Sequence, residues 1–200
     1  MSIIIHPFIS DQRFNWYRRG GALKNAFFRI MDNNEEIFDI KSALILSAQS
    51  YFKLLRVEIV ISSHDLIIKE VYRLRFFKEN FLHLTGVNTD LKKKDFFDKC
   101  LIGTINENDY KFGPYNDRKT VKRKLKQLLN VGNFFDTAIF VQENFVKNKI
   151  ICNIATCDGK CTIGFVDNKV YLRPKTILTN NHLDQNKPIY LIKPKKHKLL

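Results

Sequence analysis

Residues 71–87 read VYRLRFFKENFLHLTGV, and the interpretation of the whole chain starts from this stretch. Its first half alternates between apolar and basic residues, which is typical of a strand with one buried and one polar face. The basic residues are Arg73 and Arg75. Two cations at alternate positions of a strand lie ~7 Å apart, a spacing that can hold one phosphate from two sides. The alternative is an ordinary half-buried strand whose charged side chains lie in water.

The second half of the stretch is expected to be extended as well, after an interruption at residues 78–80. In an extended segment Leu82 and Leu84 share the apolar face, and His83 lies on the polar face. Gly86 ends the segment. The two halves together predict a polar sheet face that carries two arginines and a histidine.

Two later segments resemble parts of a known family, as does this stretch. They are KKDFFDKCL at 93–101 and IGFVDNKVYLRPKTIL at 163–178, and they follow YRLRF and FLHLTGV in the same order. The likeness runs over residues 37–178 with family-like spacing. The chain resembles a phage- and mobile-element-associated nuclease family of the barnase–EndoU–colicin–RelE-like (BECR) type, apparently the fourth phage type.

This resemblance implies RNA cleavage without a metal, by groups that converge on one face of a twisted sheet. Such cleavage needs a base for the 2′-hydroxyl, an acid for the leaving 5′-oxygen and cations for the phosphorane. A histidine can be the base or the acid near neutral pH. The second proton-transfer group stays open between Glu79 and Tyr72. The expected catalytic residues are His83, Arg75, Arg173, Lys175 and Thr176.

The expected fold class is α+β, with N-terminal helices packed on a twisted, mostly antiparallel sheet of four to six strands, an estimate from the pattern count. An extension at 1–34 would precede a single domain at 35–193 and a basic, disordered tail at 194–200. In the extension, Trp16 stands among arginines and would pack on the domain or contact nucleic acid. Pro174 is expected to end the fourth strand of a C-terminal meander. The predicted helices are 35–55, capped by Asn33 with Glu36, 89–102 and 117–129; the predicted strands are 57–61, 66–77, 138–145, 149–155, 161–166, 169–173 and 189–192.

The formal net charge of +14 favours a polyanionic partner, although coding bias in an A/T-rich genome also enriches lysine. The predicted helix at 117–129 turns apolar residues inward and cations outward. Five cations over three turns repel one another and favour a nearby anion; a solvated lysine face is the alternative. The expected nucleic-acid-binding residues are Arg73, Lys78, Lys119, Lys122, Arg123 and Lys126.

The cysteine spacing predicts reduced thiols without metal. Cys152, Cys157 and Cys161 could meet on a hairpin, but a zinc site needs a fourth ligand and none is close in sequence. The chain contains no cofactor-binding motif. The first residues lack the features of a signal peptide, and the apolar run at 43–61 is interrupted by charges, so a cytoplasmic protein without membrane contact is expected.

These observations predict a toxin-like, metal-independent endoribonuclease carried by a phage or mobile element. Its partner would be RNA, whether tRNA, mRNA or rRNA, together with a possible antitoxin or host protein. The alternative is a non-catalytic protein that keeps the nuclease fold and binds RNA or a host protein in phage defence or counter-defence.

Overall fold

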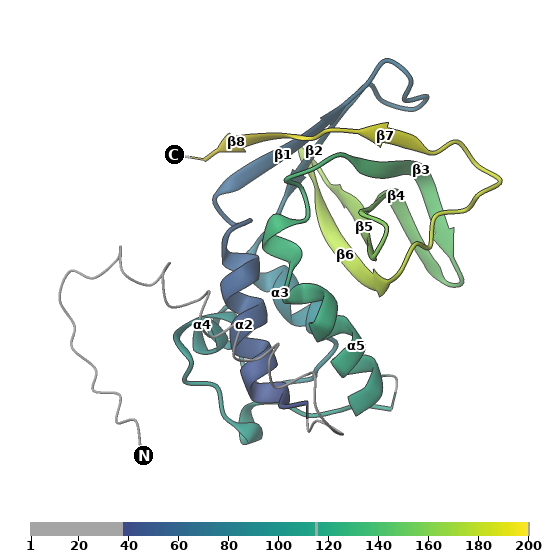
Figure 1. The fold of residues 1–200 in the computed structure, drawn as a ribbon. Helices are drawn as coiled ribbons and strands as arrows, with labels where there is room; N and C mark the ends of the chain where they lie inside the picture. The colour runs from purple at the N-terminus through teal and green to yellow at the C-terminus, as the bar shows by residue number, and fades with distance from the viewer. Residues whose placement is uncertain (1–37, 115, 200) are drawn as a thin grey trace. The chain divides into compact units, whose positions relative to one another are not determined.

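A computed structural model describes residues 38–114 and 116–199 of the chain. In this part a layer of helices packs against one long, curled sheet (Figure 1). The predicted α+β class is confirmed, whereas the estimate of four to six strands is wrong, because the described residues form an eight-stranded sheet. The helices are α2 (Ile40–Phe52), α3 (Lys78–Thr85), α4 (Lys93–Ile102) and α5 (Arg118–Leu128), with the short 3-10 helices η1 (Glu107–Asp109) and η2 (Val131–Asn133). The strands are β1 (Val57–Ser62), β2 (Val71–Arg75), β3 (Ile139–Lys147), β4 (Ile150–Cys157), β5 (Cys161–Asn168), β6 (Tyr171–Thr179), β7 (Tyr190–Ile192) and β8 (Lys195–Lys198).

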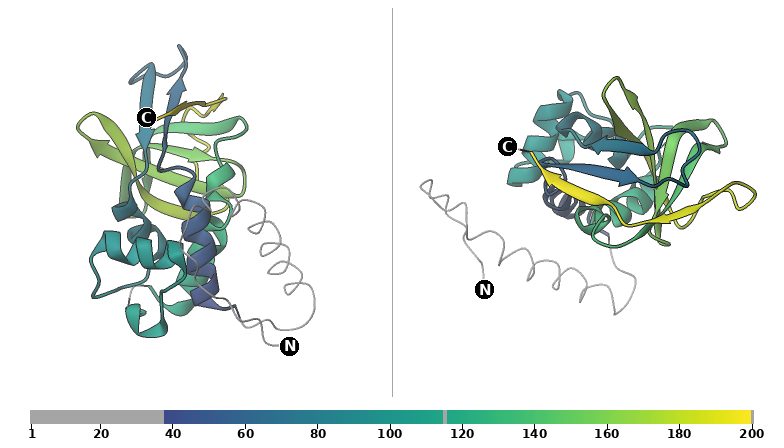
Figure 2. Two further views of the ribbon diagram at one scale, coloured as in Figure 1. Left: turned by 90° about the vertical axis from the view of Figure 1, so that its left-hand side faces the viewer. Right: turned by 90° about the horizontal axis from the view of Figure 1, so that it is seen from above.

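The described strands form one sheet in the order β7-β3-β4-β5-β6-β2-β1-β8. Neighbouring strands run antiparallel, as predicted, except that β2 and β6 pair in parallel through Leu74 and Leu172. This pairing joins two segments that are far apart in the sequence. The two further views of the ribbon show β2 and β6 side by side within the curled sheet (Figure 2).

Aromatic side chains fill the space between the helices and the sheet. The ring of Tyr51, from α2, lies 5.5 Å from Phe76, 5.4 Å from Phe81 and 5.9 Å from Phe97 between centroids. Its hydroxyl donates to the backbone carbonyl of Phe77 at 2.9 Å, so this buried polar atom is satisfied. The contacts fix α2 against the segment that leads from β2 into α3.

The expectation that residues 81–85 are extended is wrong, because Lys78–Thr85 is the helix α3. Phe81, Leu84 and Thr85 are buried, and this spacing of three and four residues matches a helical face rather than a strand. The Asn80 side chain accepts from the backbone N–H of Phe77 and supports the first turn. Gly86 adopts a positive φ of 79°, the left-handed conformation with which helices commonly end.

Three other predicted boundaries are also wrong. The first helix begins at Ile40, because the Asp39 carboxylate accepts from the backbone N–H groups of Lys41 and Ser42 and caps it there. The next helix, α4, begins at Lys93 rather than near residue 89, because the Thr89 hydroxyl donates instead to the carbonyl of Asp109. The strand predicted at 66–77 is too long, because the observed strand β2 spans only Val71–Arg75. The proposed cap residues Asn33 and Glu36, and the extension at 1–34 with Trp16, lie outside the described residues.

Pro174 does not end its strand, contrary to the prediction, since β6 continues to Thr179. Phe165 of β5 pairs with Pro174, and Gly164 pairs with Thr176, so β6 holds one extra residue, Lys175. This irregularity is a β-bulge, a place where a proline is tolerated within a sheet. The bulge turns both Lys175 and Thr176 toward partly exposed positions between the buried Pro174 and Ile177.

The described part of the basic tail, residues 194–199, is not disordered, contrary to the prediction. Lys195–Lys198 pairs antiparallel with β1 as the edge strand β8, and the Leu199 N–H donates to the carbonyl of Arg56 at 2.9 Å. Lys196 also forms an ion pair with Asp136. Backbone pairing with β1 therefore orders a segment whose side chains show no apolar pattern. Its lysines disfavour pairing of a further strand with this edge of the sheet.

Candidate active site

His83 lies in the last turn of α3, on the helix face opposite the buried Phe81 and Leu84. Its side chain is exposed, and its imidazole hydrogen-bonds to the backbone of Lys175 in the bulge of β6. The segment that carries the histidine and the segment that carries Arg173 therefore meet, as the sequence suggested. The helix places the imidazole at this point, although a strand was expected to do so.

Lys124, from α5, stands beside His83. A Cβ atom on Gly86 would lie 3.1 Å from the Lys124 ammonium nitrogen and 3.0 Å from its Cδ, so this side chain packs directly over the end of α3. Burial lowers the pKa of Lys124, and the neighbouring Arg123 lowers it further. Gly86, which has no side chain, leaves room for the Lys124 side chain at the end of α3.

Cations from three elements, α4, α5 and β6, act on one imidazole. Burial lowers the pKa of His83 first, followed by the positive charge of Lys124, and Lys93 and Arg173 lower it further. The bond to the Lys175 backbone opposes these effects. We call His83, Lys93, Lys124 and Arg173 the basic cluster. Within the described residues no carboxylate forms an ion pair with its members, so the cluster keeps a concentrated positive charge.

Arg75 and Arg173 lie on the same face of the sheet, because each stands one residue beyond the paired Leu74 and Leu172 on parallel strands. The guanidinium of Arg75, however, covers aromatic rings. Its central carbon lies 4.9 Å from the ring centroid of Tyr171 and 5.7 Å from that of Phe77. Arg75 thus borders the basic cluster and is held by cation–π contacts.

Lys175 and Thr176 contribute differently from each other. The Lys175 backbone binds His83, whereas its ammonium group donates to the carbonyl of Ile151 at 3.2 Å. The Thr176 methyl group lies 3.0 Å from where a Cβ on Gly164 would stand, so this side chain packs over β5. Of the expected catalytic residues, His83 meets the backbone of Lys175, and the charge of Arg173 acts on its imidazole. Arg75 stands beside Arg173 on the adjacent strand.

One comparison with known proteins gives a match, and it is to a family model. The family model for the phage-Barnase-EndoU-ColicinE5/D-RelE like nuclease4 matches residues 43–196, which include every member of the basic cluster. The chain belongs to this nuclease family. No curated protein and no solved structure gives a significant match.

Membership of a nuclease family means that nucleic acid is the class of substrate, which fits the uncompensated positive charge. Two of the expected nucleic-acid-binding residues already form ion pairs with carboxylates of the chain. Arg73 pairs with Glu58 at 2.7 Å, and Lys78 pairs with Asp98 at the same distance. They therefore contribute less positive charge to the surface than the sequence suggested.

The basic helix of this family member has the predicted form. The Asp117 carboxylate accepts from the Thr120 N–H at 2.7 Å and caps α5, while Val121, Leu125 and Leu128 are buried. Lys119, Arg123 and Lys126 are exposed, and Lys122 is half-buried. Lys124 follows the buried Val121 by one turn at the margin of the apolar stripe. This position is the sequence feature that sets Lys124 apart from the outward cations of α5, and no pattern in the sequence marks Lys93 as a neighbour of His83.

The two proposed second acid–base residues, Tyr72 and Glu79, have different surroundings. Tyr72 is buried on the other face of β2 and donates to Glu143; burial, followed by this contact, raises its pKa. Glu79 pairs with Lys94 at 3.2 Å. Lys124, whose charge acts on His83 from α5, is a further candidate for the second proton transfer.

The four cysteines of the nuclease-family chain are all buried with free thiols. Burial raises the pKa of Cys100 to about 12 and that of Cys152 to about 11, and it also raises that of Cys161. Among the described residues, no group of three His, Cys, Asp or Glu side chains could hold a metal ion. The same residues include no helix with the length and apolar character needed to cross a bilayer.

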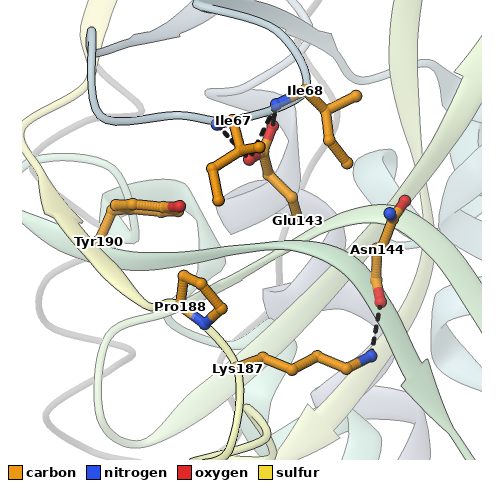
Figure 3. Close-up of a pocket in the computed structure, with 7 residues that line it drawn as sticks. All are labelled: Ile67, Ile68, Glu143, Asn144, Lys187, Pro188 and Tyr190. Carbon is orange, nitrogen blue, oxygen red and sulfur yellow. Dashed lines mark hydrogen bonds between the residues drawn. The ribbon is translucent and has the colours of Figure 1, made fainter.

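A hollow of about 270 Å³ lies elsewhere on this family member, between the β1–β2 connection and β7 (Figure 3). Its floor holds the buried Glu143, whose carboxylate accepts from the backbone N–H groups of Ile67, Ile68 and Lys69. None of the expected catalytic residues lines this hollow. The carboxylate has a structural role there, because it satisfies donors that the connection would otherwise leave unpaired.

Proposed function

We propose that the chain is a metal-independent endoribonuclease that cuts RNA through attack by a 2′-hydroxyl and leaves a 2′,3′-cyclic phosphate. The observation that carries the proposal is the basic cluster, in which one imidazole of lowered pKa faces Lys93, Lys124 and Arg173. A phosphodiester bound there would neutralise charges that repel one another. The imidazole would then lie beside the reacting group.

In the mechanism, neutral His83 takes the proton of the 2′-hydroxyl, and the 2′-oxygen attacks the adjacent phosphorus. Arg173 and Lys124 stabilise the negative charge that accumulates on the phosphorane oxygens. The bond to the 5′-oxygen breaks, and Lys124 supplies the proton that this leaving group needs. Water then moves the proton from the imidazolium to the lysine and restores both groups. The Lys175 backbone holds the imidazole ring in place.

The biological part of the proposal is a toxin-like role for a phage or mobile element in the cytoplasm. The family description supports the phage association. An enzyme that cuts cellular RNA requires control, so an antitoxin or host protein that covers the basic cluster is part of the proposal.

The direct test is incubation of the purified chain with total cellular RNA, with and without EDTA. The proposal requires cleavage of tRNA, mRNA or rRNA at the same rate in both reactions. Loss of cleavage in EDTA that added divalent metal restores would contradict metal independence. Tight RNA binding without any cleavage would support the non-catalytic alternative.

The pH dependence of cleavage tests the role of His83 as the base. Because the surrounding cations and burial lower its pKa below the ordinary 6.5, the imidazole is largely neutral at pH 7. We expect the single-turnover rate to fall as the pH drops through this lowered pKa and to level off above it. A rate that instead rises as the pH falls would assign His83 the role of the acid.

The salt dependence of RNA affinity tests the outer face of α5. Changing both Lys119 and Arg123 to alanine should reduce the slope of log affinity against log salt by about 1.4 if each contacts one phosphate of single-stranded RNA. The matched control changes Lys149 and Lys160, two exposed lysines in strand connections, and should leave the slope unchanged. A slope unaffected by the α5 changes would mean that this face is only solvated.

A further inference from the structure

Arg75, Phe77 and Tyr171 form one connected group at the edge of the basic cluster, and we call it the aromatic–arginine group. The rings of Phe77 and Tyr171 have centroids 5.4 Å apart and are tilted by 37°. The guanidinium of Arg75 lies over both rings. All three residues are half-buried, so part of the group is open to solvent.

The surroundings of Arg75 differ from those of its basic neighbours. Arg73 and Lys78 on the same stretch each pair with a carboxylate at 2.7 Å. Within the described residues no carboxylate pairs with Arg75, and its planar cation faces aromatic rings instead. An arginine plane on aromatic rings extends a flat surface on which a further π-system can stack.

The position of the group links it to the phosphate-binding residues. Tyr171 and Arg173 stand two residues apart on β6, on the same face, so their Cα atoms lie ~7 Å apart. Arg75 stands beside Arg173 on the adjacent parallel strand. This separation is comparable with the length of one nucleotide unit. A base next to a phosphate held by Arg173 can therefore reach the rings.

We propose that the aromatic–arginine group is a nucleobase-stacking subsite, so that the chain binds unpaired nucleotides in preference to base-paired ones. The proposal rests on the proposed function, because the phosphate at the basic cluster sets the position of the base. A base within a duplex has both faces covered by its neighbours, whereas an unpaired base can leave the strand and stack on the group. The substrate class is thus single-stranded RNA or an RNA loop.

The test measures binding of a fluorescent 12-nucleotide single strand and of the duplex of the same sequence. His83→Ala serves as the parent chain so that the probes stay intact. Adding Tyr171→Ala should weaken single-strand binding by about ten- to a hundredfold, the scale of one lost stacking contact, and change duplex binding less than threefold. Tyr171→Phe keeps the ring and should bind like the parent. Phe140→Ala, at a 40% exposed aromatic on β3, is the matched control and should affect neither probe.

A second variant covers the case in which Tyr171→Ala does not fold. Arg75→Lys keeps the charge and removes the plane, so it should weaken single-strand binding while the salt slope stays unchanged. Equal losses on both probes, or no loss in either variant, would overturn the subsite alone, whatever the outcome of the cleavage assays. Failure of the parent chain to bind RNA would overturn the proposed function and the subsite together.

Discussion

Replacing His83 by alanine is expected to lower the rate of RNA cleavage by about 100-fold or more, the scale for loss of a positioned acid–base group. The imidazole is the only titratable group of the basic cluster that is expected to be neutral at pH 7. Its exposed side chain contributes little to the core, so the free energy of unfolding should change by less than about 1 kcal/mol. Single-turnover cleavage, RNA affinity and the melting temperature are the three measurements.

His64→Ala is the matched control, since His64 is exposed in the β1–β2 connection. Its removal should leave cleavage unchanged. A large fall in the stability of His83→Ala would mean that the bond to the Lys175 backbone is mainly structural. Full activity of His83→Ala would remove the residue from the mechanism and leave Arg173 and Lys124 as its main components.

Replacing Arg173 by alanine is expected to reduce kcat by about 100- to 1,000-fold, the effect of removing one group that stabilises transition-state charge. Arg173 is exposed on β6, and its charge reaches His83. Arg173→Lys should recover part of the loss, because an ammonium keeps the charge but lacks the two parallel donors of a guanidinium. Quenched-flow measurements with saturating RNA would give kcat directly.

The control for Arg173 is Arg56→Ala, which removes an exposed arginine at the junction of α2 and β1, where it contacts Phe52. This change should leave kcat unaffected. If Arg173→Ala weakened RNA affinity while kcat stayed constant, Arg173 would bind substrate and transition state equally well. The phosphorane would then depend on Lys124 alone among the residues assigned to it.

The sequence predicted those elements whose signals are local. The basic helix α5 was found because apolar residues and cations alternate at helical spacing along it. The strands predicted at 149–155 and 161–166 lie within β4 and β5, apart from one residue. The helix α3 was missed because eight residues with two leucines at alternate positions satisfy both a strand and a helical pattern. There the buried Phe81 and Leu84 decide in favour of the helix.

Long-range pairing explains the remaining differences. The strand β8 forms because β1 offers a free edge, which no pattern within its own four residues indicates. Arg75 was expected to grip a phosphate, but its partner Tyr171 is distant in sequence, so the aromatic contact could not be read from spacing. The same holds for Lys124, whose closeness to His83 depends on how α5 crosses the end of α3 over Gly86.

The most direct test of the central claim uses two RNA oligonucleotides that span a mapped cleavage site. One is all-ribose, and the other carries a single 2′-deoxy sugar on the 5′ side of the cut bond. In-line attack by the 2′-oxygen predicts cleavage of the first oligonucleotide only, in EDTA, with a 2′,3′-cyclic phosphate detected by mass spectrometry on the 5′ fragment. Cleavage of the deoxy-substituted oligonucleotide at the same bond would contradict the mechanism and show that a different nucleophile attacks the phosphorus.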